Sequence, residues 1–318
     1  MPSSSSPTAS RASIVVAFAC LYFFWGSTYT AIRVGAQYMP ALLMGGVRYI
    51  ASGLLMLVWC RSRGLRLWWP WRAMLIQAVV GFFLLTLSNG ALIYAEKSVP
   101  SGLASLILAS MPLMVALAEM LLPGGEPLPL RGWLGLGLGM TGLGALVWPS
   151  LRTGFGGDSA RVVAIGILLF GAACWTAGSL IPRRARLPMH AFVASAWQML
   201  LGGLISMIAG SCLGQWPQFH VNVASVSSVA YLVVFGSLVG YTSFVYLLEH
   251  VPVAKVSSYA YVNPVVAVVL GILLLGERPE PAEFAGMVLI LLSVFLVTTS
   301  RIQAHPSNPA ELERLPGE

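Results

Sequence analysis

The chain has 318 residues, of which 57% are hydrophobic and only 9% are charged, whereas an ordinary soluble domain carries about 25% charged residues. This composition excludes a soluble globule, whose surface these few polar side chains could not cover, and it predicts an all-α, polytopic membrane protein. The net charge of +7 comes from basic clusters between apolar runs, which indicates membrane topology rather than nucleic-acid binding.

Ten apolar runs are long enough to cross a membrane as helices. A polar Ser- and Pro-rich tail at residues 1–13, which we expect to be disordered, precedes the first run. That run is too long for the apolar part of a cleaved signal peptide, so we keep it as a span. The ten predicted spans are 14–36, 40–60, 73–95, 99–122, 131–149, 162–181, 190–210, 226–248, 253–275 and 282–300.

The spans divide into two sets of five around a glycine-containing linker at residues 150–161. The sets cover residues 14–149 and 162–300, and a C-terminal tail follows at 301–318. Because five is an odd number, the second set must cross the membrane in the opposite sense to the first. The sequence therefore predicts an inverted repeat whose pseudo-two-fold axis lies in the membrane plane.

The clearest sign of duplication is that features of the fourth span return in the ninth. Pro100 and Pro112 are matched by Pro252 and Pro264, 152 positions later in both cases (252−100, 264−112). A proline inside a helix removes one backbone hydrogen bond and kinks the helix. Apolar helices broken at matching places are typical of transporters, in which Pro112 and Pro264 would let the helices bend as gates. The alternative is that both prolines are ordinary kinks, which membranes tolerate.

The basic residues predict the orientation. Twelve of them fall in segments on the side of the N-terminus and five on the opposite side, while Arg48 lies inside a span, which accounts for all 18. Basic residues gather on the cytoplasmic side of a membrane. We therefore expect both termini to be cytoplasmic.

Arg48 is the ionisable residue predicted deepest within a span. Its guanidinium could bind a substrate carboxylate, with which it would form a bidentate pair. On the residues alone we favour the alternative that it satisfies carbonyls freed by a helix break or faces a water-filled cavity, because buried cations usually have a partner within the bundle. No carboxylate is predicted near mid-membrane, which disfavours an intramembrane carboxylate relay and leaves other routes of proton coupling open.

Further candidates to line a cavity are polar and aromatic side chains inside spans. Hydroxyl and amide groups there more often join helices, and Trp or Tyr near span ends is more often an interface anchor. Tyr259, Tyr261 and Asn263 stand out because they directly precede the break expected at Pro264. Together with Arg48, the candidate lining residues are Trp25, Thr28, Asn89, Ser110, Trp175, Ser179, Gln198, Tyr241, Tyr259, Tyr261 and Asn263.

The fifth and tenth spans differ from the others in composition. The fifth, 131–149, contains repeated glycines, and the tenth, 282–300, is almost wholly aliphatic. Small residues permit close helix packing. We interpret both as outer packing helices or dimer contacts, which leaves spans 1–4 and 6–9 to form a central cavity.

No residue pattern points to an enzyme, a metal site or a cofactor. The sequence contains no HExxH, P-loop or GxSxG motif. Its four cysteines are scattered and lack CxxC spacing, so neither a metal site nor a disulfide framework is expected.

Four features resemble the EamA type of drug/metabolite transporters: the FWGSTYTAIRVG segment, Pro40 followed by Arg48-Tyr49, the helices of Pro112 and Pro264, and the LLLGERP turn. The resemblance covers essentially the whole chain. It implies ten helices in an inverted repeat, a central cavity, alternating access, a bacterial inner-membrane location and export of amino acids or related metabolites. Within the family, the aromatic candidates make the chain similar to YddG-type exporters of aromatic and other bulky amino acids.

We therefore expect a secondary transporter that exports bulky neutral amino acids across the cytoplasmic membrane. The alternatives are an exporter of a different metabolite or drug, a lipid flippase, and a structural or receptor-like bundle, which would not need matching helix breaks. The expected partners are a small-molecule substrate and membrane lipid, with the protein a monomer or a homodimer.

Overall fold

The computed structural model describes residues 10–121, 129–152, 159–185, 187–251, 253–256 and 258–304. Residues 1–9, 153–158 and 305–318, which are parts of the predicted tails and linker, lie outside these ranges. The ends of these predicted segments are helical instead, because α1 begins at Arg11, α7 ends at Arg152, α8 begins at Ser159 and α14 ends at Ala304. Every regular element within them is helical, as the apolar composition predicts. The elements are α1 (Arg11–Ala36), α2 (Ala41–Ser62), α3 (Trp71–Gly81), η1 (Phe82–Ser88), α4 (Asn89–Ala95), α5 (Ser101–Leu108), α6 (Met111–Leu121), α7 (Leu130–Arg152), α8 (Ser159–Ala185), α9 (Ala191–Cys212), η2 (Trp216–Gln218), α10 (Val223–Tyr231), η3 (Leu232–Val239), α11 (Gly240–His250), α12 (Val253–Val256), α13 (Tyr259–Leu275) and α14 (Pro281–Ala304).

The helices are those of a membrane protein. In the part of the chain that the structure describes, seven helical stretches are long and apolar enough to span a membrane, and α13 and Glu283–Val297 are shorter apolar helices. The all-helical, membrane-spanning class is thus confirmed, whereas a total of ten spans stays a prediction. The seven stretches are Arg11–Ala36, Ala41–Ser62, Trp71–Ala95, Ser101–Ala118, Ser159–Pro182, Ala191–Cys212 and Val223–Leu248.

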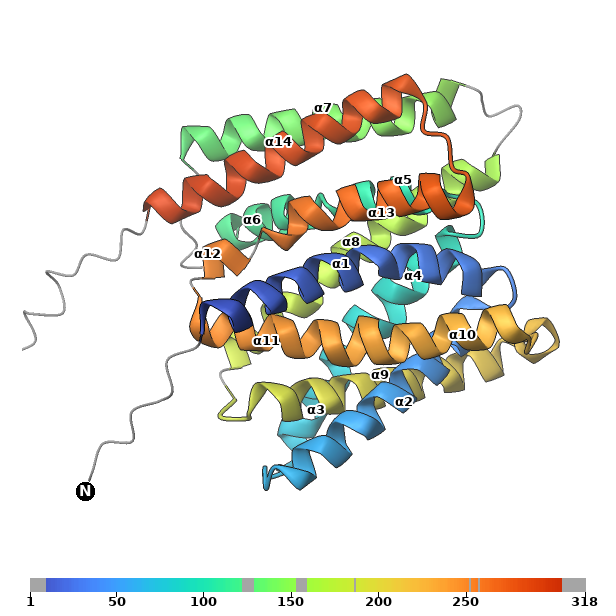
Figure 1. Ribbon diagram of the computed structural model, residues 1–318, viewed down its shortest axis with the longest axis vertical. Helices are drawn as coiled ribbons and strands as arrows, with labels where there is room; N and C mark the ends of the chain where they lie inside the picture. The colour runs from blue at the N-terminus through green and yellow to red at the C-terminus, as the bar shows by residue number, and fades with distance from the viewer. Residues whose placement is uncertain are drawn as a thin grey trace, which may run out of the picture.

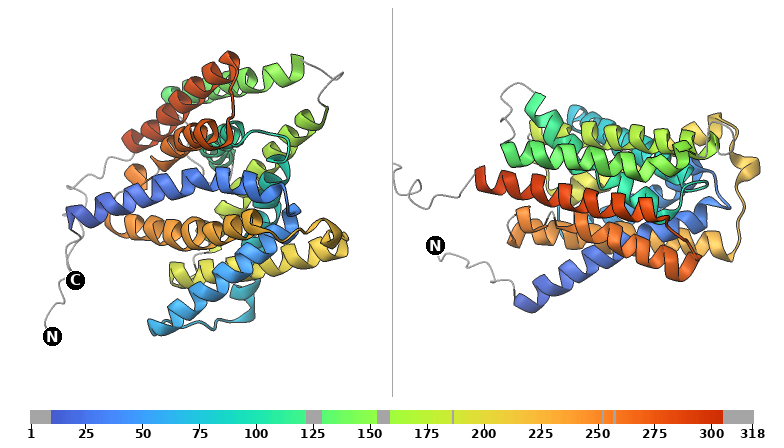
Figure 2. Two further views of the ribbon diagram at one scale, coloured as in Figure 1. Left: turned by 45° about the vertical axis from the view of Figure 1, so that its right-hand side comes forward. Right: turned by 90° about the horizontal axis from the view of Figure 1, so that it is seen from above.

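The helices run alongside one another as a bundle with two ends (Figures 1 and 2). The start of α1 and the end of α14 lie at the same end, on the left of Figure 1. We call the opposite end, which contains the connections 37–40, 96–100, 213–222 and 276–280, the distal end.

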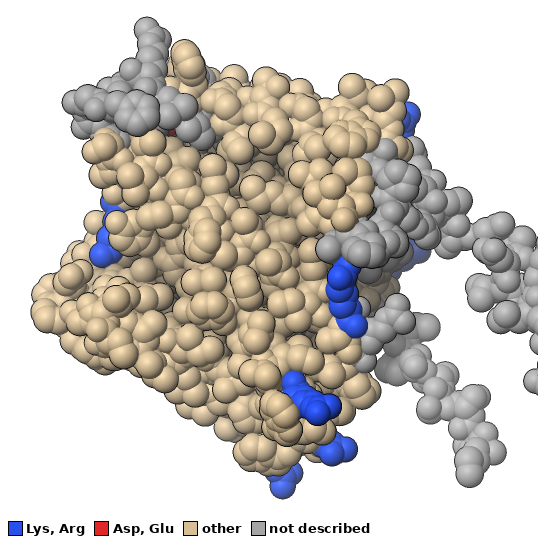
Figure 3. All heavy atoms as spheres, turned by 180° about the vertical axis from the view of Figure 1, so that it is seen from behind, with Lys and Arg blue, Asp and Glu red and all other residues tan. Residues whose placement is uncertain are grey.

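The outer surface between the two ends suits contact with lipid. Large apolar side chains such as Val58, Ile208 and Leu273 are exposed on it. Figure 3 shows a broad face free of Lys, Arg, Asp and Glu, with basic side chains near its edges. Contiguous apolar surface of this extent needs an apolar surrounding, which the hydrocarbon core of a membrane provides.

Helices α2 and α9 come from different halves and pack closely through two glycines. A Cβ atom on Gly53 would stand 2.6 Å from the backbone nitrogen of Leu200, and one on Gly203 would stand 2.7 Å from that of Ile50. Both pairs are related by the same offset of 150 positions (203−53, 200−50). The contact is therefore reciprocal between the halves, as in an interface with two-fold symmetry.

Helices α7 and α14 repeat this arrangement at the other side of the bundle, where they lie side by side (Figure 1). A Cβ atom on Gly135 would stand 3.1 Å from the carbonyl oxygen of Ser293, and one on Gly142 would stand 3.0 Å from that of Gly286. These pairs are again reciprocal, with an offset of 151 (286−135, 293−142). Gly135 and Gly142 of the fifth predicted span thus serve close helix packing, whereas a Cβ atom on Gly137 or Gly144 would meet nothing within 4 Å.

The third helix of each half contains a π-helical segment. These segments, η1 and η3, begin 150 positions apart (232−82). A π-helical turn is wider than an α-helical turn, is rare, and is frequent at functional sites. Helix η3 contacts α1 and α2, and η1 contacts α8 and α9, so each π-helical segment touches helices of the other half.

Both halves have an interrupted helix, but the interruptions are not equivalent. In the first half a turn separates α5 from α6, and Pro112 lies in the first turn of α6. A backbone N–H at this position would have no partner within the helix, so proline costs no helical hydrogen bond there. In the second half Ser258 is in the turn before α13, and Pro264 lies inside α13. The helix break that we expected directly before Pro264 therefore lies earlier, at Ser258. Pro264 can remain inside α13 because its fixed φ angle is close to the helical value and it removes only one backbone hydrogen bond. Tyr259, Tyr261 and Asn263, which we expected directly before the break, therefore all follow it within α13.

We expect Gly53→Ala to destabilise the protein, because its methyl group would meet backbone of Leu200 that cannot rotate away. Overpacking of this kind costs about 1–3 kcal/mol, which lowers the melting temperature by several degrees. The control is Gly137→Ala, where a Cβ atom meets nothing within 4 Å. Thermal unfolding of the detergent-solubilised variants checks this, and equal melting temperatures would contradict the packing argument.

Candidate functional site

Three aromatic rings from three helices meet inside the bundle. The ring of Trp25 on α1 lies 5.3 Å from that of Phe244 on α11 and 5.2 Å, edge-on, from that of Tyr259 on α13, measured between centroids. Phe244 and Tyr259 are 5.9 Å apart. All three side chains are only partly buried. We call Trp25, Phe244 and Tyr259 the aromatic cluster; its rings offer the kind of surface that bulky, partly apolar solutes contact.

Two glycines of the third helix in the second half make room for this cluster. A Cβ atom on Gly240 would stand 2.4 Å from both Cδ1 and Nε1 of the Trp25 indole, and one on Gly236 would stand 2.8 Å from Cγ2 of Thr28. The indole Nε1 donates a hydrogen bond of 3.1 Å to the carbonyl oxygen of Gly236. Gly236 in the π-helical segment η3 and Gly240 at the start of α11 therefore fix the position of Trp25.

Arg48 on α2 reaches the same segment, η3. Its side chain is buried, its Nε donates to Oγ of Ser237 at 3.3 Å, and its guanidinium lies 4.8 Å from the ring centroid of Tyr49. The Nη2 atom would stand 3.1 Å from a Cβ atom on Gly236. Within the described residues, Nη1 has no hydrogen-bond partner and no carboxylate pairs with the guanidinium. A buried cation with an unused donor is suited to an anionic group of a ligand.

The bundle holds a second polar cluster between α3, α9 and α11. Gln198 Nε2 donates to Oε1 of Gln77 at 2.7 Å, and the Ser195 hydroxyl donates to the Tyr241 hydroxyl. The Tyr241 ring lies 6.3 Å from that of Phe244. Gln198 and Tyr241 thus bind side chains of neighbouring helices, and Tyr241 continues the aromatic cluster towards α9.

Other predicted lining residues use their polar groups within their own segment. Asn89, the first residue of α4, donates from Nδ2 to the carbonyl of Leu84 in the preceding π-helical segment η1 at 3.0 Å. Hydroxyls of three residues donate to a carbonyl three positions earlier at 2.5–2.9 Å: Thr28, Ser110 and Ser179. Trp175 is half-buried on α8. These contacts position helix turns, and they do not bring the five residues to one point.

Tyr261 and Asn263 lie on α13 with Tyr259, but they do not join the aromatic cluster. Tyr261 packs against Phe295 of α14, with the ring centroids 6.3 Å apart. Asn263 is buried, and its Oδ1 has no hydrogen-bond partner among the described residues. Burying an amide oxygen without a partner is costly, so Asn263 is available to a donor that enters the bundle.

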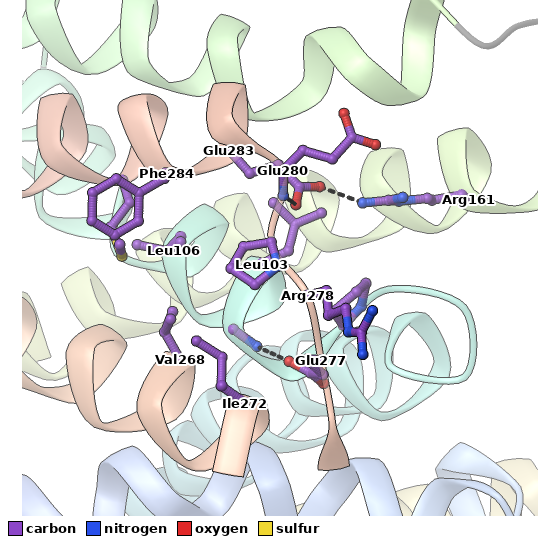
Figure 4. Close-up of a pocket in the computed structure, with 14 residues that line it drawn as sticks. Leu103, Leu106, Arg161, Val268, Ile272, Glu277, Arg278, Glu280, Glu283 and Phe284 are labelled. Carbon is purple, nitrogen blue, oxygen red and sulfur yellow. Dashed lines mark hydrogen bonds and ion pairs between the residues drawn. The ribbon is translucent and has the colours of Figure 1, made fainter. Parts of the chain in front are cut away.

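A hollow of about 90 Å³ lies at the distal end (Figure 4). Pockets that hold drug-sized ligands measure about 300–1,000 Å³, so this one admits water or a small ion rather than a bulky solute. Helices α5, α8, α13 and α14 and the connection 276–280 form its walls. The lining residues are Pro100, Gly102, Leu103, Leu106, Arg161, Val268, Ile272, Glu277, Arg278, Pro279, Glu280, Glu283, Phe284 and Met287.

Glu277 joins the two halves beside this hollow. Its Oε1 accepts hydrogen bonds from the backbone N–H and the hydroxyl of Ser101 at 2.7 and 2.9 Å, and its Oε2 accepts one from the N–H of Gly102 at 3.1 Å. These donors form the N-terminus of α5, where a negative charge is favourable. Gly276, with φ of 65°, ends α13 in the left-handed conformation and turns the chain towards α5.

A second acidic residue at the distal end pairs with a cation. The Glu283 carboxylate accepts from Arg161 at 2.5 Å and from the backbone N–H of Glu280 at 2.9 Å (Figure 4). Among the described residues, no three His, Cys, Asp or Glu side chains gather as a metal site requires. The distal carboxylates therefore act on helix ends and on a cation of the protein itself.

The sequence interpretation missed the distal residues Glu96 and Glu277. Glu96 lies in the connection between α4 and α5 and is completely buried. A comparison of the two halves could have found it, because the repeat places Leu248 opposite Glu96 (248−96 is 152). A charge present in one copy and absent from the other indicates a role that the fold alone does not require.

Known proteins resemble this chain over nearly its whole length. The uncharacterized inner membrane transporter YedA of Escherichia coli (strain K12) is 35% identical over 291 residues, which is 91% of each chain. The uncharacterized transporter YvbV of Bacillus subtilis (strain 168) is 26% identical, over 91% of this chain and 92% of YvbV. Protein PagO of Salmonella typhimurium is 24% identical, over 92% and 94%.

The fold also has a counterpart among solved structures. A crystal structure of a protein with 20% sequence identity aligns with this chain at a TM-score of 0.63. The alignment covers 93% of this chain and the whole of the other chain. The model of the EamA-like transporter family matches residues 12–148 and again residues 162–299, so the domain is duplicated. The two matches cover most of the sequence, and the chain therefore belongs to the EamA-like transporter family.

Proposed function

We propose that this transporter exports bulky neutral amino acids, or related metabolites, by alternating access between the two ends of the bundle. Ten spans in an inverted repeat are supported by the reciprocal contacts of α2 with α9 and of α7 with α14. The YedA name supports the inner membrane. The excess of basic residues at the end that holds both termini supports a cytoplasmic position for that end, and the distal end then faces outwards.

The observation that carries the substrate class is the buried Arg48 beside the aromatic cluster. Its unused Nη1 donor suits the carboxylate of an amino acid, and the rings of Trp25, Phe244 and Tyr259 suit a bulky side chain. The distal hollow is too small for such a solute, so a solute that leaves between these helices would require them to move apart. The interruptions near Pro112 and Pro264 supply points at which helices can bend during opening.

We test the substrate class by counterflow of labelled phenylalanine, with threonine alongside, in liposomes that contain the purified protein. We expect uptake that unlabelled aromatic amino acids compete. The absence of uptake of both, with correctly inserted protein, would contradict an amino-acid substrate. It would favour another metabolite, a drug or a lipid, which vesicle scrambling assays then separate.

Arg48→Gln is expected to reduce phenylalanine counterflow about tenfold, because a hydrogen bond to a charged group is worth about 1.5–3 kcal/mol. Arg48→Lys keeps the positive charge but loses the planar guanidinium that pairs bidentately with a carboxylate. We therefore expect a counterflow rate between those of the unaltered protein and Arg48→Gln. The control is Arg61→Gln on the exposed end of the same helix. Equal rates in Arg48→Gln and Arg61→Gln would contradict a role of Arg48 in binding, provided that both variants elute as monodisperse protein.

A further inference from the structure

Glu96 is a buried carboxyl group for which the structure gives no bonded partner. Its relative exposure is 0%, and neither Oε1 nor Oε2 has a hydrogen-bond partner among the described residues. Such isolation is costly for an ionised carboxylate, which normally accepts several hydrogen bonds, and less costly for a neutral carboxyl group. The site thus favours the protonated form.

The charged groups around Glu96 do not neutralise it. Arg33 on α1 directs its Nη1 to the carbonyl oxygens of Glu96 and Val99 rather than to the carboxylate. The other ionisable groups that act on Glu96 or respond to it are Tyr29 on α1 and Glu277 after α13. Burial raises the pKa of Glu96 well above its ordinary value, the Arg33 cation lowers that pKa, and the Glu277 carboxylate raises it.

Glu96 also lies near the contact that joins the two halves at the distal end. It precedes α5, whose N-terminus Glu277 holds through Ser101 and Gly102. Opening the distal end would separate these segments and admit water, which stabilises the ionised form of Glu96. Closure and protonation therefore favour each other.

We propose that Glu96 is a proton-binding site that couples closure of the distal end to pH. The proposal rests on the proposed function, because it assigns a proton to one step of the alternating-access cycle. The direction follows from linkage: the closed state binds the proton more tightly, so it gains population as the pH falls. As the pH rises above the ordinary range of a carboxyl group, the open state is increasingly favoured.

The first test is spectroscopic and needs no substrate. At neutral pH, the infrared band of a protonated carboxyl group is expected in the membrane-reconstituted protein, lost in Glu96→Gln and kept in Glu280→Gln, which alters an exposed carboxylate at the same end. A band that survives in Glu96→Gln, or no band in the unaltered protein, would overturn the proposal.

The second test follows opening directly. Leu103 is buried in the wall of the distal hollow, whereas Ile272 on the same wall is 44% exposed. The alkylation rate of Leu103→Cys, divided by that of Ile272→Cys to remove the pH dependence of the thiol itself, measures how often the end opens. Mass spectrometry of the peptides separates these sites from the native cysteines.

We expect this ratio to rise with pH by up to about tenfold per pH unit, the slope for linkage to one proton. In Glu96→Gln the ratio should be independent of pH. A wild-type ratio that does not change with pH, or a pH dependence that persists in Glu96→Gln, would overturn the proposal. Because neither readout involves a solute, failure of phenylalanine uptake would affect the proposed substrate and leave this result standing.

Discussion

Glu277→Gln is expected to loosen the N-terminus of α5 and to open the distal end more often. The carboxylate accepts three hydrogen bonds from Ser101 and Gly102, and an amide offers one oxygen and no charge in its place. The loss of hydrogen bonds to a charged group costs about 1.5–3 kcal/mol, which is roughly a 10- to 100-fold gain in the open population.

Hydrogen–deuterium exchange of the peptide that contains α5 measures this loosening. Exchange should accelerate there in Glu277→Gln and remain unchanged in α9, which lies away from the distal contact. The control is Glu280→Gln, a neighbouring carboxylate that is exposed. Unchanged exchange in α5 would show that Glu277 does not hold the two halves together.

Gly271→Ala gives an independent route to the same result. A Cβ atom at this position would stand 2.4 Å from Oε2 of Glu277 and 3.0 Å from Oγ of Ser101. The carboxylate is the flexible end of its side chain, so it would move away from α5 while the helices stay in place. If exchange in α5 is faster in both variants, the cause is the lost contact between Glu277 and α5 and not the amide group introduced by Glu277→Gln.

The same substitution links Glu277 to the proton site. Removing its negative charge removes one of the causes that raise the pKa of Glu96. In Glu277→Gln the pKa of Glu96 should therefore be lower, and the pH range over which the alkylation ratio rises should shift towards acid.

The sequence predicted the helices well because their signal is local. Long apolar runs need no partner to be recognised as helices in a membrane. The glycines of the fifth predicted span likewise indicated close packing, which the contacts of Gly135 and Gly142 with α14 confirm. Repetition supplied the division into halves, and the family match to both halves confirms the duplication.

The candidate site was harder to predict because its members are joined only by tertiary contacts. Asn89 and Ser110 were chosen for polarity, yet each bonds a carbonyl in its own segment. Phe244 was not chosen, because an aromatic residue in an apolar run carries no signal of its own until Trp25 and Tyr259 are placed beside it.

The position of the second helix break shows the same dependence on tertiary structure. Proline marks where a helix is weakened, but the turn forms where the neighbouring packing favours it. In this chain Pro264 sits inside α13 while the turn lies at Ser258. The hydroxyl of Ser258 is 2.5 Å from that of Tyr22 on α1, a contact that apolar periodicity does not reveal.

Gly240→Ala is expected to impair the transport of bulky solutes strongly. The added Cβ atom would stand 2.4 Å from two atoms of the Trp25 indole, so the ring must leave its place. It would then lose its hydrogen bond to the Gly236 carbonyl and its contacts with Phe244 and Tyr259. Overpacking together with the lost contacts amounts to about 2–3 kcal/mol.

That free energy corresponds to a roughly 30- to 100-fold fall in kcat/KM for phenylalanine, measured by counterflow. The repeat supplies the matched control, Gly90→Ala, at the equivalent position (240−90 is 150). There the nearest atom is a flexible methyl group of Leu42 at 3.3 Å, so transport should change little. Threonine, which has no aromatic side chain, should be affected less than phenylalanine in Gly240→Ala. An equal loss for both solutes would mean that Trp25 supports the helices without contacting the solute, and the site would then have to be sought nearer Arg48 and Asn263.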